Sequence, residues 1–390
     1  MSAGYYDIAL CAPFSLVPER FSTKSTQRLI AEVLSGVMKK ARMPMGELDG
    51  LSIASFTLAP DTAIAMVEHL GLSCRYVDQP ILGGASAIAA VRRAARMVAA
   101  GDVRTVAIIG ADKNDATSFS KIVEDFSVFA RDAVWPYGAG GPNAVFALIT
   151  DHYMHRFGAA REDFGALCVA QRNNAQGVPH AIFRDRPLDL SAYMSARPIA
   201  EPLCLYDCVM PVAGGEGCLV MHMRDAEAAG LPYARRLATL ERHNAFCDDP
   251  VQTRGGWAMD EAAFWAQSGT TPDTVDCIET YDDYPVMSFI QLEDLGFCSE
   301  GEAAAFVRTL TRDRDGRLPI NTSGGQLSAG QAGAAGGHLG LVEGLRQVTG
   351  LAEGWAVERA RTALVAGYGM ANFDRGLCAT AALLAEGRRA

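Results

Sequence analysis

The chain has 390 residues, of which 49% are hydrophobic and 21% charged. This length is too great for one small core and predicts two domains of ordinary size, and the composition excludes a disordered chain. The formal net charge of −10 at pH 7 excludes a general nucleic-acid surface, which needs clustered Lys and Arg. A local basic patch for a phosphorylated ligand is compatible with this charge.

The N-terminus has neither a basic segment nor a long apolar run, so no secretory signal is expected. No charge-free apolar run of 18 residues occurs, which predicts that the chain does not enter a membrane. The ten cysteines are scattered, and the closest pair, Cys204 and Cys208, lacks the C-x-x-C spacing of a zinc ribbon. We expect reduced, buried thiols in a cytoplasmic protein, with no metal site.

Helical and strand patterns alternate in the N-terminal part, which favours an α/β fold. Four elements are expected there: a helix at 26–40, a strand at 51–55, an alanine-rich helix at 86–100 and a buried strand at 103–110. Gly83-Gly84 opens the second helix and Gly101 ends it. Gly110-Ala-Asp112 ends the last strand without the glycine spacing of a dinucleotide fold, so no nicotinamide cofactor is inferred.

The C-terminal part repeats this order, which indicates a weak internal duplication. Its elements are a helix at 262–268, a strand at 275–280, a glycine-rich loop from Gly324-Gly325, a helix at 337–348 and a strand at 362–366 that ends at Gly367. Between the two parts, residues 119–250 are richer in Arg, Asp, Tyr and Pro and show less regular periodicity. Long insertions on an α/β scaffold are often functional loops.

The glycine-rich loop carries a family resemblance. It reads Asn321-Thr-Ser-Gly-Gly-Gln-Leu-Ser-Ala-Gly-Gln331-Ala-Gly-Ala-Ala-Gly-Gly337 and resembles the N-x-x-G-G-x-L-S-x-G-H-P-x-G-A-x-G loop of thiolases. Upstream, Tyr281-Asp282-Asp283-Tyr284 stands where thiolases of the sterol-carrier-protein type carry H-D-A-F. The segment 291–302 is similar to that group, and Gly83-Gly84-Ala85-Ser86 resembles the turn that presents the nucleophilic cysteine.

This resemblance spans nearly the whole chain and implies a thiolase fold. Two similar five-stranded α/β halves would pack as α-β-α-β-α layers around an inserted loop domain. Residues 1–117 and about 211–225 would form the N-terminal half, about 118–210 the loop domain and 226–390 the C-terminal half. The resemblance also implies a homodimer in which the N-terminal halves pair through an edge strand.

The residues that thiolases use for acyl transfer are missing. Gly84 stands at the position of the nucleophilic cysteine and Gln331 at that of the histidine of the loop. The site of the second cysteine reads Gly367-Tyr368-Gly369, and Cys378 falls in the following strand. Covalent acyl transfer through a cysteine thioester is therefore not expected.

The first site candidate is Tyr281, at the carboxyl end of a predicted strand. It could donate to a thioester oxygen, act as a general base if its pKa were lowered, or be a buried tyrosine with one hydrogen-bond partner. The motif resembles that of thiolase-like aldolases that shorten steroid side chains, which carry tyrosine at this position and a second catalytic tyrosine at that of Gln331. Tyr368, between two glycines at an expected strand end, is the candidate substitute for the second one.

The other candidates each have a functional and a structural interpretation. Gln331 could hold a thioester carbonyl or cap a loop, and Ser86 could be a nucleophile or a helix N-cap. Asp282 could orient Tyr281 or pair with an arginine, whereas Asp283 carries no separate signal. The resemblance further places four residues beside the substrate: Gly84, Gly324, Gly325 and His338. A structural role for His338 is the competing interpretation.

The leading hypothesis is an enzyme that makes or breaks a carbon–carbon bond beside a CoA thioester by aldol or retro-aldol chemistry. Such chemistry needs a base and an oxyanion stabiliser but no acyl-enzyme. One alternative is thiolase-like acyl transfer with an atypical nucleophile. Another is a non-catalytic scaffold subunit, because some chains that resemble this one work beside a small acyl-CoA-binding partner with an OB-fold and a zinc ribbon. Acyl-CoA is the expected substrate in each enzymatic case.

Overall fold

The computed structural model describes residues 7–118, 136, 138, 141–310, 312–373 and 375–390. Nine strands form one mixed sheet in the order β3-β2-β4-β7-β1-β8-β11-β10-β9, and β5 pairs with β6 separately. The strands are β1 (Ile8–Ser15), β2 (Gly50–Ala54), β3 (Tyr76–Asp78), β4 (Thr105–Lys113), β5 (Pro198–Ala200), β6 (Leu203–Cys204), β7 (Ala213–His222), β8 (Tyr233–His243), β9 (Cys277–Glu279), β10 (Thr362–Asn372) and β11 (Arg375–Arg388).

The sheet consists of two similar halves joined where β1 pairs with β8. In the N-terminal half, β3, β2 and β4 are parallel, and β7 lies antiparallel between β4 and β1. In the C-terminal half, β9 and β10 are parallel, and β11 lies antiparallel between β10 and β8. A parallel bridge from Ile278 to Ile320 extends this half by a fifth chain segment. The expected duplication is confirmed.

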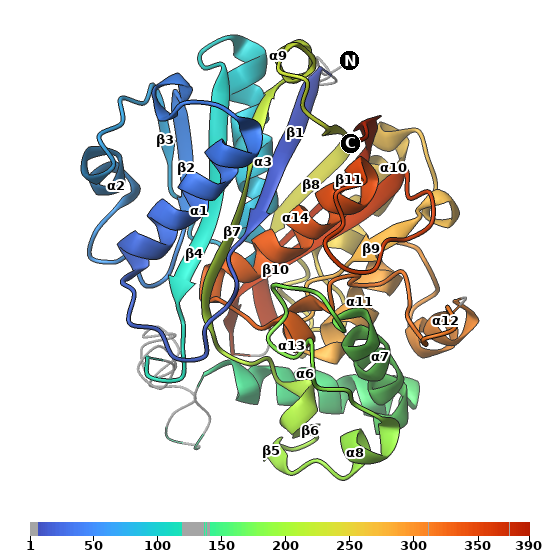
Figure 1. Ribbon diagram of the computed structural model, residues 1–390. Helices are drawn as coiled ribbons and strands as arrows, with labels where there is room; N and C mark the ends of the chain where they lie inside the picture. Colours follow the sequence, from blue (N-terminus) through green and yellow to red (C-terminus); the bar gives the residue numbers. More distant parts are fainter. Residues whose placement is uncertain (1–6, 119–135, 137, 139–140, 311, 374) are drawn as a thin grey trace.

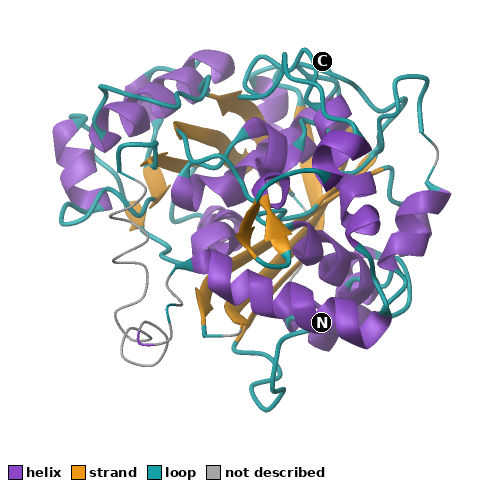
Figure 2. Cartoon of the chain, turned by 90° about the horizontal axis from the view of Figure 1, so that it is seen from below, coloured by secondary structure: helices purple, strands orange, loops and turns teal. Residues whose placement is uncertain are grey.

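Helices cover both faces of the sheet and fill the space between its halves (Figures 1 and 2). The middle layer consists of α3 (Ser86–Ala100) and α14 (Gly336–Thr349), which share one apolar core with the inner faces of both halves. On the outside, α1 (Thr26–Ala41) covers the N-terminal half, and α10 (Gly256–Ser268) with α11 (Pro285–Asp294) covers the C-terminal half. These are the five layers of the thiolase fold.

A group of helices from the inserted segment lies against one end of the sheet (Figure 1). It contains α6 (Pro142–Phe157), α7 (Arg161–Asn174) and α8 (Leu190–Met194). The shorter helices elsewhere are α2 (Ala63–His69), α9 (Met223–Ala228), α12 (Ala303–Thr309) and α13 (Gly325–Ala329). The domain boundaries at about residues 118, 211 and 226, which separate the two thiolase halves from the loop domain, stay our proposal. Within the described part of the chain, no helix is long and apolar enough to cross a membrane.

The helices expected at 26–40, 86–100 and 337–348 are confirmed within one residue at each end. The expected end of the last C-terminal strand at Gly367 is wrong, because β10 continues to Asn372 and places Tyr368 inside the strand. Gly369 explains the difference. A Cβ there would lie 1.9 Å from the carbonyl oxygen of Leu82, so this glycine lets the strand pass close to the Gly83-Gly84 turn.

Two further differences concern less regular parts of the sequence. Segment 119–250 contains the long strands β7 and β8 in addition to helices, and its residues 119–135, 137, 139 and 140 lie outside the described part. The helix expected at 262–268 begins earlier, at Gly256. β8 mixes apolar positions with charged ones, and β7 has three glycines and Glu216 near its start, which leaves it only a short apolar run.

Candidate active site

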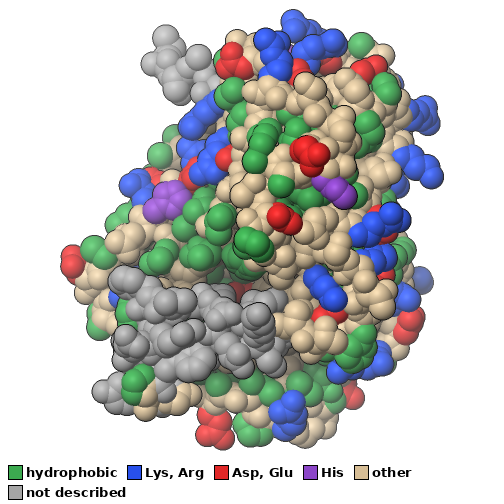
Figure 3. Space-filling model, turned by 90° about the vertical axis from the view of Figure 1, so that its left-hand side faces the viewer, with side chains coloured by type: hydrophobic (Ala, Val, Ile, Leu, Met, Phe, Trp, Pro, Cys, Tyr) green, Lys and Arg blue, Asp and Glu red, His purple; other side chains and the backbone are tan. Residues whose placement is uncertain are grey.

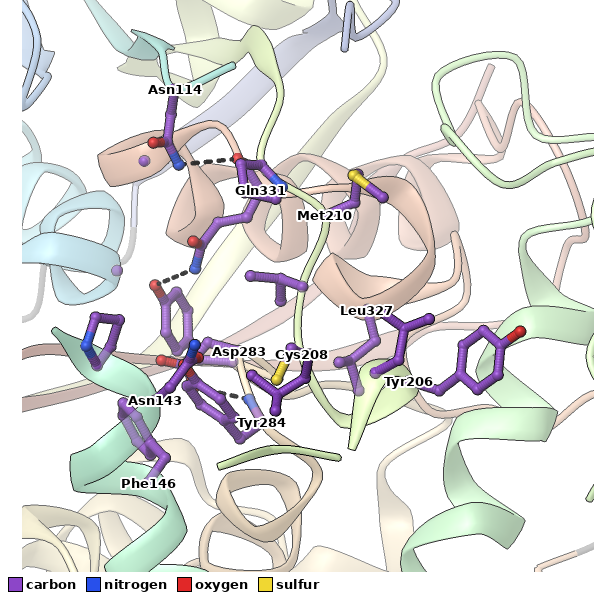
Figure 4. A pocket seen from close by; sticks show the side chains of 18 of the residues that line it. Asn114, Asn143, Phe146, Tyr206, Cys208, Met210, Asp283, Tyr284, Leu327 and Gln331 are labelled. Carbon is purple, nitrogen blue, oxygen red and sulfur yellow. Dashed lines mark hydrogen bonds between the residues drawn. The ribbon is translucent and has the colours of Figure 1, made fainter. Parts of the chain in front are cut away.

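A cavity of about 580 Å³ lies where the two halves of the sheet meet the inserted helices (Figure 4). Much of its wall is aromatic or aliphatic, including Phe56, Phe146, Phe183, Tyr206 and Tyr284. Arg20, Arg172, Arg186 and Arg197 add positive charge to the wall. Of the described lining residues, Asp283 is the one with a carboxylate. Apolar surface combined with a few polar groups is typical of small-molecule sites.

Tyr281 and Gly84 meet inside this cavity, although they lie far apart in the sequence. Gly84 belongs to the turn that opens α3, and Tyr281 follows β9 by two residues. A Cβ atom on Gly84 would lie 1.9 Å from Cε2 and 2.2 Å from Cζ of Tyr281. The phenol ring therefore fills the space into which a side chain at the nucleophile position would project, and the two positions cannot both carry large side chains.

The hydroxyl of Tyr281 accepts a hydrogen bond from Nε2 of Gln331 at 3.3 Å, and the same amide nitrogen donates to Oε1 of Gln326 at 3.0 Å. The backbone of Tyr281 is held by Gln291, which both accepts from its N–H and donates to its carbonyl at 2.9 Å. Burial, followed by the charges of Asp283 and Asp282, raises the pKa of Tyr281 well above its ordinary value. Tyr281 is therefore a hydrogen-bond donor at neutral pH and not a ready base.

The two neighbouring aspartates have different surroundings. Asp282 faces away from the cavity and caps α13, accepting from the backbone N–H of Gln326 at 2.8 Å and of Leu327 at 3.3 Å. Burial raises the pKa of Asp282 to about 7 although these bonds oppose the shift. Asp283 lines the cavity, and burial followed by the charge of Asp282 raises its pKa well above the ordinary value.

Two glycines stand at the start of α13, and the second of them lies against the capping carboxylate of Asp282. Gly324 and Gly325 have φ angles of +100° and +60°, and a Cβ on Gly325 would lie 2.1 Å from Oδ2 of Asp282. Neither glycine lines the cavity. Their position indicates that they shape the loop that carries Gln331 and have no direct contact with a ligand in the cavity.

Ser86 and His338 also lie behind the cavity wall. The Ser86 hydroxyl donates to the carbonyl of Pro80 at 3.1 Å and accepts from the N–H of Leu82 at 3.0 Å, so it stabilises the turn before α3. His338 packs so closely on β4 that a Cβ on Gly110 would lie 2.4 Å from its Nδ1. Burial lowers the pKa of His338 to about 4, which keeps the imidazole neutral.

Tyr368 contributes its ring to the cavity wall, but its hydroxyl is engaged elsewhere. That hydroxyl donates to Oε1 of Gln252 and accepts from the N–H of Gly376. The ring stacks on Trp257 with the centroids 5.7 Å apart. These contacts favour a structural role for Tyr368 over that of a second catalytic tyrosine.

Several lining residues are not among the site candidates that the sequence offers. Tyr284 stacks on Phe146, with ring centroids 4.2 Å apart, and its hydroxyl donates to Oδ1 of Asn143 at 2.6 Å. Figure 4 shows Asp283, Tyr284, Asn143 and Phe146 grouped on one side of the cavity, with Gln331 across from them. Asn143 and Phe146 come from α6 in the inserted segment, so only the fold brings them to the motif.

Comparisons with known proteins identify the family of this chain. A family model described as thiolase C-terminal domain-like matches residues 240–377. The chain is 32% identical over 348 residues to the 17-hydroxy-3-oxo-4-pregnene-20-carboxyl-CoA lyase of Mycobacterium tuberculosis, with 84% of this chain and 88% of that protein aligned. It is 28% identical over 369 residues to a steroid side-chain-cleaving aldolase of Thermomonospora curvata, with 90% and 92% aligned.

Among solved structures, an Ltp2-ChsH2(DUF35) aldolase superposes with a TM-score of 0.84 at 26% identity, over 98% of this chain and 99% of the other. An acetyl-CoA acetyltransferase from Syntrophomonas wolfei, 13% identical with a TM-score of 0.70, supports the fold alone. The chain belongs to the thiolase superfamily. Within it, the two relatives aligned above are named as a lyase of a CoA thioester and as an aldolase.

The contact between Gly84 and Tyr281 can be tested by a double-mutant cycle. Gly84→Ala should lower the free energy of unfolding by about 1–3 kcal/mol, because the new methyl group overlaps the phenol ring. In a Tyr281→Ala background the same change should be tolerated, giving a coupling energy of roughly 1–3 kcal/mol in urea denaturation. Gly46→Ala is the matched control, because a Cβ there meets nothing within 4 Å. Additive effects within about 0.5 kcal/mol would contradict the contact.

Proposed function

We propose that this protein is a CoA-thioester-dependent carbon–carbon lyase that works by an aldol or retro-aldol route. The observation that carries the proposal is the phenol of Tyr281, which fills the space of a nucleophile side chain at Gly84 and places its hydroxyl beside Gln331. Cleavage between the α and β carbons of a β-hydroxyacyl thioester develops charge on the thioester oxygen. A protonated phenol can stabilise that oxyanion without forming an acyl-enzyme.

Gln331 supports this role of Tyr281. Its amide cannot titrate, so it keeps one hydrogen-bonding pattern across the working pH range. Because Nε2 of Gln331 donates to the phenol oxygen, the Tyr281 hydroxyl hydrogen is directed away from Gln331 and is available to a ligand. The raised pKa of Tyr281, caused mainly by burial, keeps that hydrogen in place at neutral pH.

The cavity wall supports a large apolar acyl group attached to CoA. Its aromatic residues suit a rigid hydrocarbon, and the relatives are named for steroid substrates. Three wall arginines, Arg20, Arg186 and Arg197, are exposed to solvent. We propose that they bind the phosphates of CoA, which matches the local basic patch that the acidic chain allows.

Acyl transfer through cysteine is less well supported. Among the described residues that line the cavity, Cys208 is the one cysteine, and burial raises the pKa of its thiol to about 12. A nucleophilic cysteine needs a lowered pKa or an adjacent base. The alternative of a non-catalytic scaffold subunit does not explain why Tyr281 and Gln331 form a hydrogen bond inside a cavity.

We further propose a homodimer and a small partner protein in the cytoplasm. β3 is the edge of the nine-stranded sheet, and the side of the molecule that carries β3 and α2 shows gathered hydrophobic side chains (Figure 3). Ile64 and Ile81, on α2 and just after β3, are 63% and 57% exposed. An open edge strand flanked by apolar residues favours pairing with a second copy.

The proposal of a small partner protein rests on the similarity to the solved Ltp2-ChsH2(DUF35) aldolase.

Thiol alkylation should spare the activity. Iodoacetamide at about pH 8 should label the exposed Cys247 first, because the raised pKa of Cys208 leaves little thiolate in the cavity. Turnover and peptide mass spectrometry would be followed together over the reaction. Complete inactivation that coincides with labelling of one cavity cysteine and is prevented by substrate would support acyl transfer instead.

The dimer should be visible by light scattering coupled to size exclusion. The purified chain is expected to elute at twice its mass at micromolar concentration, and Ile81→Glu should shift it toward the monomer by placing a charge on the interface. Ile81→Ala, which keeps the surface uncharged, is the milder comparison. A folded monomer for the unmodified chain would contradict the proposal.

Tyr281→Phe removes only the hydroxyl and keeps the ring against Gly84. We expect kcat for cleavage to fall by roughly 10²-fold or more, because an oxyanion donor typically contributes that much. The melting temperature should change little, since the hydroxyl accepts one long bond of 3.3 Å. A folded variant that turns over within a factor of about three of the parent would make Tyr281 structural.

A further inference from the structure

A retro-aldol cleavage needs a group that removes the proton of the β-hydroxyl, and Tyr281, Gln331 and Tyr368 do not supply one. Tyr281 stays protonated because burial raises its pKa. Gln331 does not titrate. The Tyr368 hydroxyl is bound to Gln252 and Gly376. The proton acceptor must therefore be sought elsewhere on the cavity wall.

Asp283 is the one carboxylate among the described lining residues. Its Oδ1 accepts a hydrogen bond from the backbone N–H of Tyr284 at 3.1 Å, which fixes the side chain at the start of α11. It forms no salt bridge within the described part of the chain. Its charge acts on the two tyrosines beside it, adding to the effect of burial in raising the pKa values of Tyr281 and Tyr284.

Asp282, the preceding residue, has the same side chain but a different environment. Both oxygens of Asp282 are used to cap α13, and that carboxylate does not line the cavity. Asp283 instead lines the cavity together with Tyr281 and Tyr284, the residues on either side of the two aspartates.

We propose that the carboxylate of Asp283 is the proton acceptor and donor of the reaction, an inference that rests on the proposed lyase function. Its oxygen takes the proton of the substrate β-hydroxyl. The C–O bond becomes a carbonyl as the bond between the α and β carbons breaks, and the electron pair forms a thioester enolate whose oxygen receives the hydrogen bond of Tyr281. The Asp283 acid then returns the proton to the α carbon, which releases a carbonyl product and a shortened acyl-CoA and restores the carboxylate.

The surroundings of Asp283 suit this task. A carboxylate removed from water is a stronger base than one in solvent, and transfer is most efficient when the two pKa values approach each other. Other ionisable groups face the same cavity: Arg20, Arg172, Arg186, Arg197, Tyr206, Cys208, Tyr281, Tyr284 and Tyr368, with Asp282 behind the wall. Because the acceptor must be ionised, the activity should rise with pH through the raised pKa of Asp283.

The test compares Asp283→Asn and Asp283→Glu with the parent, each with the same copurified partner if one is present. The probe is a β-hydroxyacyl-CoA with a bulky apolar acyl group, and release of the carbonyl product is measured. Asp283→Asn should lose roughly 10²- to 10⁴-fold in kcat, whereas Asp283→Glu should recover part of the loss because it keeps a carboxylate. Asp294→Asn is the matched control, since Asp294 is also a buried aspartate with a raised pKa but lies outside the cavity.

The pH dependence and the stability separate a catalytic role from a structural one. The rising limb of the kcat profile should vanish in Asp283→Asn and shift in Asp283→Glu. A carboxyl whose pKa is raised on folding stabilises the protein below its unfolded pKa and loses this contribution as the pH rises through its folded value. The melting temperature of Asp283→Asn at pH 8 should therefore equal or exceed that of the parent.

The outcomes are distinct. An active parent with an Asp283→Asn variant of similar kcat and unchanged pH profile would overturn the role of Asp283 and leave the lyase function standing. Equal losses in Asp283→Asn and Asp283→Glu, with both melting temperatures lowered, would make Asp283 structural. A parent that cleaves none of the β-hydroxyacyl thioesters, with or without partner, would refute the lyase function and this role with it.

Discussion

The close approach of the Tyr281 ring to the backbone of Gly84 is the constraint on which the site depends. A side chain at position 84 and a phenol at position 281 exclude each other, because a Cβ would lie 1.9 Å from the ring. Related glycines let the backbone segments around this contact meet. A Cβ on Gly337 would lie 1.9 Å from the carbonyl oxygen of Gly84, and one on Gly369 equally close to that of Leu82. The same fold thus presents a phenol where a thiol would otherwise act.

Burial decides the chemistry of the groups in this cavity. The phenol of Tyr281, the thiol of Cys208 and the carboxyl of Asp283 all have pKa values raised mainly by removal from water. The first two are therefore held in their neutral forms at physiological pH, one as a donor and one as an inert thiol. The carboxyl becomes a stronger base by the same effect. One physical cause thus gives three groups three different roles.

Much of the fold could be predicted from sequence, because helix α3 and the glycine turn before it are encoded locally by Gly83-Gly84, an alanine-rich run and Gly101. The difference between the environments of Asp282 and Asp283 could not be predicted from the sequence. The two residues are chemically identical, and only the packed loop shows that one caps α13 while the other faces the cavity. The expected strand end at Gly367 is wrong for a related reason, since Gly369 beside Tyr368 marks a close backbone approach and not the end of a strand.

The exposed arginines of the cavity wall belong to a protein whose net charge is −10. An anionic ligand therefore experiences repulsion from the whole molecule at long range and attraction from Arg20, Arg186 and Arg197 only nearby. At physiological ionic strength the Debye length is about 8 Å, so the distant repulsion is screened while contacts at the wall are retained. Moderate salt should thus favour the approach of a polyphosphate ligand that low salt would hinder, the reverse of the behaviour of a uniformly basic binding protein.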